Sequence, residues 1–350
     1  MPEAPILFKN LTSDALHTAL ADHGVSLRLA RRLQAAVLRH GKIPAEMPEV
    51  AGRLLAALRA TTEVPQLELV RRTESPRDGF VKYLFRGARG DAFEAVGIPL
   101  LHRPADPKYV ACVSSQVGCA MGCVFCATGR MGFQRNLAPW EMVDQVIRIQ
   151  ATSPHPVRGV VFMGMGEPML NYDAVITAAR IMSEPCGLAI SAKAITISTA
   201  GIVPAIRRFT AERQPYRLVV SLTSADPSQR AELMPIEHAH PTPELLAALR
   251  EYHAATQERV TLAWIMMEGI NTRPEDAAQL AELTRGLPVK LDLIDVNDPT
   301  GRFHPPIPAT LATFRDALRQ HLAAPVARRY SGGSDIHAAC GMLAGGDRHP

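Results

Sequence analysis

Four of the six cysteines in the chain lie close together, between Cys112 and Cys126. Cys119, Cys123 and Cys126 have the spacing C-x3-C-x2-C, and the aromatic Phe125 directly precedes the last of them. Three thiolates on one loop can bind three irons of a 4Fe–4S cluster and leave the fourth iron open to a small molecule. A structural zinc site would need a fourth Cys or His nearby, and Cys112 is poorly placed to supply it. The spacing therefore favours a cluster over a zinc ion or three unligated thiols, and the role of Cys112 stays open.

A second candidate site is the turn GMGEP, which contains Gly166 and Glu167 and follows the apolar segment GVVFMG. A glycine lets the backbone approach a ligand closely, and a carboxylate can bind an ammonium group. Turns of this kind also occur as simple connections between a strand and a helix, so the turn alone does not identify a ligand. Cys186 and Cys340 are isolated in the sequence, and by itself each is best interpreted as a small buried apolar residue.

These residues lie in a region, from about residue 108 to 322, in which short apolar strands alternate with amphipathic helices. The predicted strands are YVACVSS, GVVFMG, AITIST, RLVVSL, VTLAWIM and KLDLIDV. The alternation predicts an α/β fold with a parallel sheet covered by helices, and six units are too few for a closed barrel of eight. We therefore expect an open, partial (β/α)6 barrel, with a doubly wound sheet as the alternative. In either fold the chemistry lies at the carboxyl ends of the strands.

The chain divides into four predicted segments: a helical domain at 1–62, a short β-strand connecting segment at 63–104, the partial barrel at 105–325 and a C-terminal segment at 326–350. In the helical domain, ALHTALADHG and LRLARRLQAAVLRHG have apolar residues three and four positions apart, and each ends in glycine. Eight Lys and Arg residues stand here against five acidic residues. The clustered arginines form either a solvated helix face or a surface that contacts phosphates: Arg28, Arg31, Arg32 and Arg39.

Composition excludes several broad classes of protein. The chain has 350 residues, of which 47% are hydrophobic and 21% charged, as in an ordered globular protein. The net charge of +4 permits a nucleic-acid partner without requiring one. We expect no secretory signal, because the start lacks a basic segment followed by an apolar run, and no membrane span, because no uninterrupted apolar run is long enough. Six cysteines, four of them clustered, do not resemble a disulfide framework, so we expect a cytoplasmic location.

The motifs beyond the cysteines resemble one family. CVSSQVGCAMGCVFCATG, GMGEP, ISTAGIVP, VVSL, ELMPI and DIHAACG occur in the order seen in the RlmN/Cfr family of radical S-adenosylmethionine (SAM) RNA methyltransferases. The resemblance extends from about Phe80 to Gly345. It implies a partial barrel with a 4Fe–4S cluster, and an enzyme that methylates a ring carbon of adenine in RNA.

The same resemblance gives the fourth cysteine a role. An electron-poor ring carbon of adenine cannot attack the methyl group of SAM, so the family uses two equivalents of SAM per turnover. One equivalent methylates a cysteine near the C-terminus, which Cys340 matches. The other, bound to the open iron, yields a radical that removes hydrogen from this methyl group, and the carbon radical adds to the base. Cys112 matches the second cysteine, which releases the protein–RNA adduct by forming a disulfide.

Other family positions are matched in this sequence. Glu94, in DAFEAVGIP, matches the proton acceptor in adduct breakdown, although by itself it could be a surface Glu on a strand. The expected SAM contacts lie at or just beyond predicted strand ends: Gly166, Glu167, Ser198, Ser221, Leu222, Thr223 and Asn297.

The sequence also departs from the family where substrate choice could be affected. Thr223 replaces a family histidine, and the segments at Trp264 and at Asp295 and Val296 differ from the family pattern; we expect all three to lie on the active face of the barrel or beside it. Carbon 2 of adenine is favoured over carbon 8, the position a Cfr-like enzyme would methylate. The expected partners of this monomer are 23S rRNA, tRNA or both, and an electron donor such as flavodoxin or ferredoxin. The alternatives are a radical SAM enzyme with a non-RNA substrate and a non-enzymatic zinc- and RNA-binding module.

Overall fold

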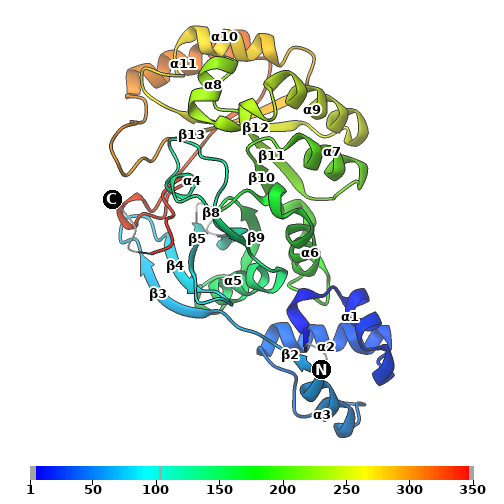
Figure 1. The fold of residues 1–350 in the computed structure, drawn as a ribbon. Coiled ribbons are helices and arrows are strands. Elements are labelled where there is room, and N and C mark those ends of the chain that lie inside the picture. The colour runs from blue at the N-terminus through cyan, green and yellow to red at the C-terminus, as the bar shows by residue number, and fades with distance from the viewer. Residues whose placement is uncertain (1–4, 102–104, 347–350) are drawn as a thin grey trace.

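The computed structural model describes residues 5–101 and 105–346, and its central feature is one ten-stranded sheet (Figure 1). Seven neighbouring strands are parallel: β6 (Lys108–Cys112), β9 (Val157–Phe162), β10 (Ile195–Thr199), β11 (Arg217–Ser221), β12 (Val260–Met266), β13 (Val289–Asp295) and β14 (Val326–Arg329). Three antiparallel strands extend the sheet beyond β6: β5 (Ala92–Leu100), β4 (Val81–Arg86) and β3 (Glu68–Glu74). The six predicted strands of the barrel are all present, and they are neighbours in chain order.

Helices connect the parallel strands in the order that the sequence predicts. They are α5 (Pro139–Thr152), α6 (Tyr172–Ser183), α7 (Val203–Ala211), α8 (Pro227–Leu233), α9 (Thr242–Thr256), α10 (Pro274–Leu283) and α11 (Pro308–His321). Most of them begin with proline in the first turn, where the missing N–H is not needed for the helix. This arrangement confirms the prediction of an open, partial barrel in which helices connect parallel strands.

The strands alternate between two faces. In β12, Trp264 is fully buried and its ring lies 6.3 Å from that of Phe314 in α11, so this side of the strand faces the helices. Val219, Ala263 and Ile294 belong to the opposite face and form a separate small apolar cluster with Cys340. The inner face of the barrel is therefore where side chains from several strands can meet a ligand.

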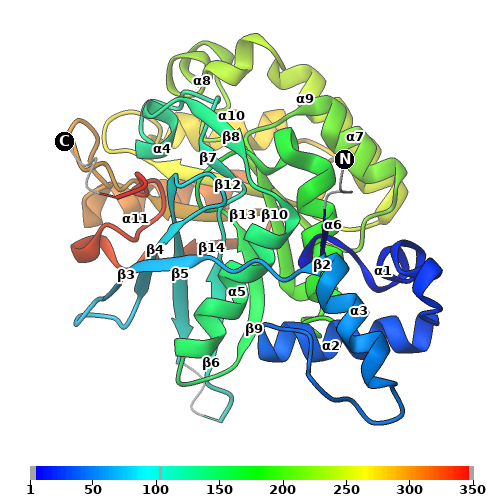
Figure 2. The ribbon, with the colours of Figure 1, turned by 60° about the horizontal axis from the view of Figure 1, so that its bottom comes forward.

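The N-terminal residues form a helical unit with its own apolar core. It contains α1 (Ser13–Ala19), α2 (Leu27–His40) and α3 (Gly52–Thr61), and a two-residue parallel pair joins β1 (Ile6–Leu7) to β2 (Thr62–Glu63). The predicted glycine ends are present, since Gly24 and Gly41 have φ of 67° and 70° and each closes a helical segment. Figure 2 shows these helices grouped on one side of the molecule, beside α5 and α6.

One buried ion pair connects this helical unit to the barrel. Lys9 Nζ lies 2.5 Å from Asp144 Oδ1 in α5, and both side chains are 1% exposed. Asp144 Oδ2 also accepts the backbone N–H of Leu67 at 2.7 Å. Burial lowers the pKa of Lys9, whereas the charge of Asp144 and its hydrogen bond raise it.

Two features of the fold differ from the prediction or add to it. The strands between residues 63 and 104 continue the barrel sheet itself, with β5 paired to β6. The C-terminal segment begins with a further parallel strand, β14, which the sequence did not reveal. Its sequence VARR is short and carries two arginines, so it lacks the apolar pattern of the other parallel strands.

Candidate active site

The three cysteines lie in the segment between β6 and α5, named here the cluster loop (residues 113–138). Cys119 comes after β7 (Gln116–Gly118), which pairs with β8 (Phe133–Asn136), and Cys126 caps the short helix α4 (Ala127–Arg130). The Cys126 N–H donates to Cys123 O at 3.1 Å, which brings these two residues into one tight turn. The loop therefore holds all three cysteines near the carboxyl end of the first parallel strand.

A donor set of three thiols is what a 4Fe–4S cluster with one open iron requires. The three thiols interact electrostatically with one another, and burial raises the pKa of Cys119 to about 12 and that of Cys123 well above its usual value. Within residues 5–101 and 105–346, no three His, Cys, Asp or Glu side chains are close enough to share one ion. In a 4Fe–4S cluster each thiolate binds a different iron, so its ligands lie farther apart than those of one zinc ion.

The GMGEP turn lies directly against the cluster loop. Gly166 has φ of 102°, and a Cβ there would lie 2.5 Å from Gln116 Cβ, so only glycine is accommodated. Gln116 Oε1 accepts the N–H of Glu167 at 2.8 Å. The Glu167 carboxylate is buried and accepts the N–H groups of Met169 at 2.9 Å and Ala200 at 2.7 Å. Burial raises the pKa of Glu167 to about 7, against the lowering effect of these hydrogen bonds.

Of the other predicted SAM contacts, two serines lie on the inner face of the sheet and one leucine lies in the hydrophobic core. Ser198 pairs with Val219, and Ser221 follows Val219 by two residues, so both serines share the inner face of β10 and β11. Leu222 is fully buried; its N–H donates to Ala263 O at 3.0 Å. The structure thus groups Ser198 and Ser221 at the inner face and leaves the Leu222 side chain in the core.

Thr223 has an unusual backbone conformation. Its φ is 64°, which is strained for a β-branched residue, and its side chain is fully buried. The hydroxyl has no hydrogen-bond partner among the residues that the structure describes. The Thr223 carbonyl accepts Asn271 Nδ2 at 2.8 Å, and Asn271 also binds the backbone at Ile265 and Met267. Asn271 therefore holds the strained turn in place.

The C-terminal segment lies directly over the carboxyl ends of the parallel strands. Gly341 O accepts the N–H of Ala127 at 2.7 Å, and Leu343 O accepts Thr128 Oγ1 at 2.6 Å. Ser331 Oγ accepts both Asn297 Nδ2 at 3.0 Å and the N–H of Cys340 at 3.1 Å. Cys340 is consequently fixed between the cluster loop and the end of β13.

Cys112 and Cys340 lie on the same side of the sheet. Cys112 is the last residue of β6 and is paired with Val161, which is also paired with Thr196 in β10. Burial raises the pKa of Cys112 well above its usual value, and the nearby Cys340 adds to this increase. Burial likewise raises the pKa of Cys340 to about 11. Both are free thiols in this structure.

Glu94 is buried beneath the C-terminal segment and is not a surface residue. Its Oε1 lies 3.2 Å from Lys82 Nζ, and its Oε2 accepts the N–H groups of Ala344 at 2.9 Å and Gly345 at 3.2 Å. Val96, two residues further along β5 and on the same face, is the partner of Cys112. Glu94 therefore lies on the same side of the sheet as the two cysteines.

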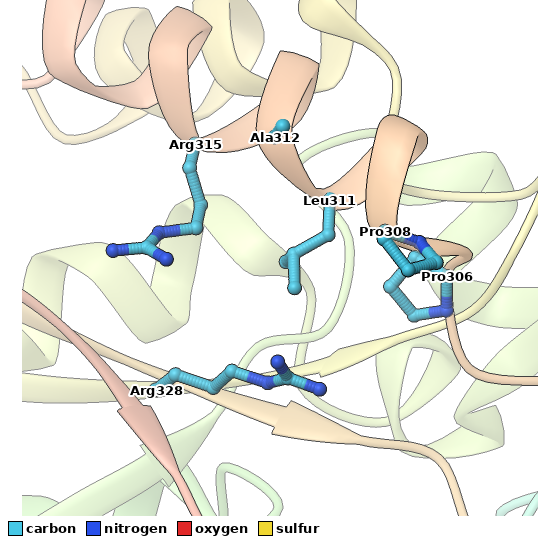
Figure 3. Close-up of a pocket in the computed structure, with 6 residues that line it drawn as sticks. All are labelled: Pro306, Pro308, Leu311, Ala312, Arg315 and Arg328. Atoms are coloured by element: carbon cyan, nitrogen blue, oxygen red, sulfur yellow. The ribbon is translucent and has the colours of Figure 1, made fainter.

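The departures from the family pattern lie in different places. The prediction that they all lie on the active face or beside it is wrong for Trp264, which faces α11 and donates Nε1–H to Asn271 O at 3.0 Å. Asp295 points to the outer side, where it pairs with Arg328 at 2.6 Å. Figure 3 shows Arg328 reaching under α11 in a surface hollow lined by Pro306, Pro308, Leu311, Ala312, Arg315 and Arg328, none of which is a predicted site residue. Cys186, expected to be buried, is partly exposed and contacts Gln34 Oε1 at 3.2 Å.

Sequence reasoning missed three polar residues that hold the site together. They are Lys82, Arg230 and Ser331, each of which binds a predicted site residue or the backbone next to one. Lys82 is a charged residue within the otherwise apolar strand VKYLF, and this was the one available signal. Arg230 and Ser331 lie in polar stretches of the sequence, PSQRAEL and RRYSGG. Nothing in the sequence therefore distinguished them from polar residues that face solvent.

Comparison with known proteins agrees with this geometry. Residues 113–281 match the family model of the radical SAM superfamily. The chain is 50% identical to a "Probable RNA methyltransferase" of Myxococcus xanthus, over 96% of this chain and 93% of that protein. It is 39% identical to a "Dual-specificity RNA methyltransferase RlmN" of Syntrophobacter fumaroxidans, over 97% and 98% of the two chains. The crystal structure of a radical SAM methyltransferase from Sphaerobacter thermophilus superimposes with a TM-score of 0.87 at 36% identity, covering 97% of this chain and 99% of that one.

Proposed function

Since the chain belongs to the radical SAM RNA methyltransferases of the RlmN type, we propose that it methylates a ring carbon of adenine in RNA through a methylated Cys340. Cys119, Cys123 and Cys126 would hold a 4Fe–4S cluster, and SAM would bind at its open iron. Together these groups supply the one-electron chemistry that removes a hydrogen from the methyl carrier. Two equivalents of SAM are used per turnover, one as the methyl source and one for this step.

The observation that carries the proposal is the position of Cys340. Cys340 packs against Val219, Ala263 and Ile294 on the inner face, and the next residue, Gly341, is hydrogen-bonded to the start of α4 beside Cys126. A methyl group on this sulfur would lie over the strand ends, where the SAM contacts are expected. Cys340 loses its thiol proton when it is methylated, and its methyl carbon later forms the bond to the base.

We assign the release step to Cys112. Before release, the radical adduct must lose one electron, which the oxidised cluster would accept. Cys112 loses its thiol proton and its thiolate attacks the sulfur of Cys340, so that the sulfur–sulfur bond forms and the bond from this sulfur to the transferred carbon breaks. The electron pair of the broken bond stays on the transferred carbon, which takes up a proton and becomes the methyl group. Glu94 accepts the proton that leaves the ring carbon, and Lys82 at 3.2 Å supplies the counter-charge to its carboxylate. The resulting disulfide must be reduced by a dithiol before the next turnover.

The proposed SAM contacts lie at or just beyond the carboxyl ends of the parallel strands. Glu167 would bind the ammonium group, and Gly166 lets the turn approach it. Ser198 and Ser221 on the inner face, the strained turn at Leu222 and Thr223, and Asn297 complete the set. This assignment is supported by the grouping of these residues around Cys340 and the cluster loop.

For the substrate we propose carbon 2 of adenine, the common activity of the family that the sequence resembles, in 23S rRNA, in tRNA or in both. An RNA substrate is supported by relatives that carry the name "Dual-specificity RNA methyltransferase RlmN". The basic face of α2 is the proposed RNA-docking surface. Arg28 and Arg31 are exposed there, whereas Arg32 is partly used within the unit, donating to Pro48 O at 2.6 Å. The enzyme would act in the cytoplasm as a monomer and receive electrons from a flavodoxin or ferredoxin. No helix in the described ranges is long and apolar enough to cross a membrane.

The test separates the two cysteines by role. A tryptic peptide containing Cys340 should be heavier by one CH2 group in wild-type protein, and Cys340→Ala should form no covalent adduct with RNA. Cys112→Ala should still be methylated at Cys340, attack the base and then remain attached to RNA on a denaturing gel. Normal turnover of Cys112→Ala, or unmethylated Cys340 in active protein, would refute the proposal. Cys186→Ala is the matched control and should behave as wild type.

A further inference from the structure

Arg230, in α8, is one of the largest fully buried side chains in the described part of the protein. Its guanidinium donates Nε–H to Leu222 O at 3.2 Å and Nη2–H to Ala200 O at 2.8 Å, and Nη1 lies 2.5 Å from Glu237 Oε2. A planar guanidinium with several fixed donors can hold such separate acceptors in one geometry, which a lysine cannot do. Arg230 thus joins the turn after β10 to the turn after β11.

Both turns belong to the proposed SAM site. Leu222 lies between Ser221 and Thr223, and the N–H of Ala200 donates to the Glu167 carboxylate at 2.7 Å. A continuous series of hydrogen bonds therefore connects Glu167, Ala200, Arg230 and Leu222. Any displacement of the guanidinium would move two of the turns on which SAM binding depends.

Arg230 is also placed to act on the cluster. The same helix accepts a hydrogen bond from the cluster loop, because Leu233 O binds the N–H of Val124 at 3.1 Å. Burial lowers the pKa of Arg230, whereas Glu237 and the nearby Cys123 raise it, and Arg230 in turn lowers the pKa of Cys123. An arginine stays protonated even when buried, so its positive charge is permanent.

Glu237 balances that charge and fixes the arginine. Its Oε1 accepts the N–H of Thr242 at 2.8 Å and its Oε2 accepts Thr242 Oγ1 at 2.8 Å, in addition to the contact with Arg230. The Glu237 carboxylate is nearly as buried as the guanidinium. The pair is therefore a neutral unit next to Cys123, held at both ends.

We propose that Arg230 and Glu237 form a positioning pair with two separable effects, one on SAM binding and one on the reduction potential of the cluster. The forked donors of Arg230 set the geometry of the SAM-binding turns, while the balance of charge beside Cys123 sets how readily the cluster accepts an electron. Reduction adds negative charge to the cluster, so a positive charge left nearby in a poorly polarisable interior favours the reduced form. This inference rests on the proposed function and extends it to residues outside the SAM and cluster contacts.

Two variants separate the effects. Glu237→Gln keeps the hydrogen bonds of the Arg230 guanidinium to Leu222 and Ala200 (the fork) but removes the negative charge of Glu237. The midpoint potential of the cluster should therefore shift to a more positive value, while SAM affinity should stay near wild type. The double variant Arg230→Gln with Glu237→Gln removes both charges and the fork. Its potential should return toward wild type, and SAM should bind about tenfold more weakly, the equivalent of one net hydrogen bond.

The midpoint potential is measured by redox titration of the anaerobically purified holoenzyme. SAM affinity is measured by titrating SAM and monitoring the change in the electron paramagnetic resonance signal of the cluster. Arg208→Gln, an exposed arginine of α7, is the matched control and should change neither quantity. If the double variant does not fold, Arg230→Lys keeps the charge and loses the fork, so only SAM affinity should fall. An unshifted potential in Glu237→Gln, or wild-type SAM affinity in every variant without the fork, would overturn the inference. A wild-type protein that holds no cluster would instead refute the proposed function itself.

Discussion

Replacing Lys9 with Met should loosen the N-terminal helical unit from the barrel. Lys9 and Asp144 are each 1% exposed, so the change leaves a buried carboxylate without its main counter-charge. Removing one partner of such a pair costs about 3–5 kcal/mol. Asp144 retains two contacts, Arg148 Nε at 3.3 Å and the N–H of Leu67 at 2.7 Å, so we expect the lower end, about 3 kcal/mol.

The assay is thermal and urea unfolding, with limited proteolysis between α3 and β3. An unfolding entropy of about 2.1 cal/mol/K per residue over the 350 residues converts that loss into a decrease in Tm of about 4 °C, if the chain unfolds as one unit. If the helical unit opens first, Tm will change less and cleavage of the connection will accelerate. Faster cleavage of this connection would locate the lost free energy at the contact between the helical unit and the barrel.

A double-mutant cycle separates the pair from its surroundings. Asp144→Asn alone should also destabilise the protein, and the two changes together should cost less than the sum of the single effects. Lys42→Met, an exposed lysine after α2, is the matched control and should stay within about 0.5 kcal/mol of wild type. Equal stability of Lys9→Met and Lys42→Met, with no change in proteolysis, would refute the reasoning.

Three further predictions concern the site and its RNA partner. Cys123→Ala should lose stably bound iron and all SAM cleavage, because two thiolates do not retain the cluster, whereas Cys186→Ala should keep both; iron analysis and product detection decide this. Because burial raises the pKa of Glu167 to about 7, SAM affinity should weaken as the pH falls through that value and the carboxylate is protonated, and Glu167→Gln should abolish this dependence in a binding titration. Charge reversal at Arg28 and Arg31 should weaken RNA binding and reduce its salt dependence while SAM binding is unchanged, as measured by filter binding at several salt concentrations.

The strands and the cluster loop could be predicted because their signals are local. Short apolar runs alternating with amphipathic helices specify parallel strands and their order. Three cysteines at fixed spacing place a cysteine-bearing loop after the first strand and predict a metal centre there. The face on which a residue lies is harder to predict. Trp264 was expected near the active face, yet in a strand buried on both sides both faces are apolar, so the sequence does not distinguish them.

The supporting polar residues could not be predicted for a different reason. Arg230 and Lys82 are charged, and a charged residue on an amphipathic element ordinarily faces water. Their burial depends on acceptors far away in the sequence, such as Ala200 for Arg230 and Glu94 for Lys82. The position of Cys340 over the barrel likewise follows from tertiary contacts with α4 and Ser331, which no local pattern records.

The most direct test of the account uses SAM that carries a fully deuterated methyl group. If the methyl group is first placed on Cys340 and one of its hydrogens is then removed, the methyladenosine in the product RNA must retain only two of the three deuterium atoms. Mass spectrometry of nucleosides from RNA methylated by the purified enzyme gives the answer. Two retained deuterium atoms are the predicted result, and a methyl group that keeps all three would show direct transfer and contradict the proposed role of Cys340.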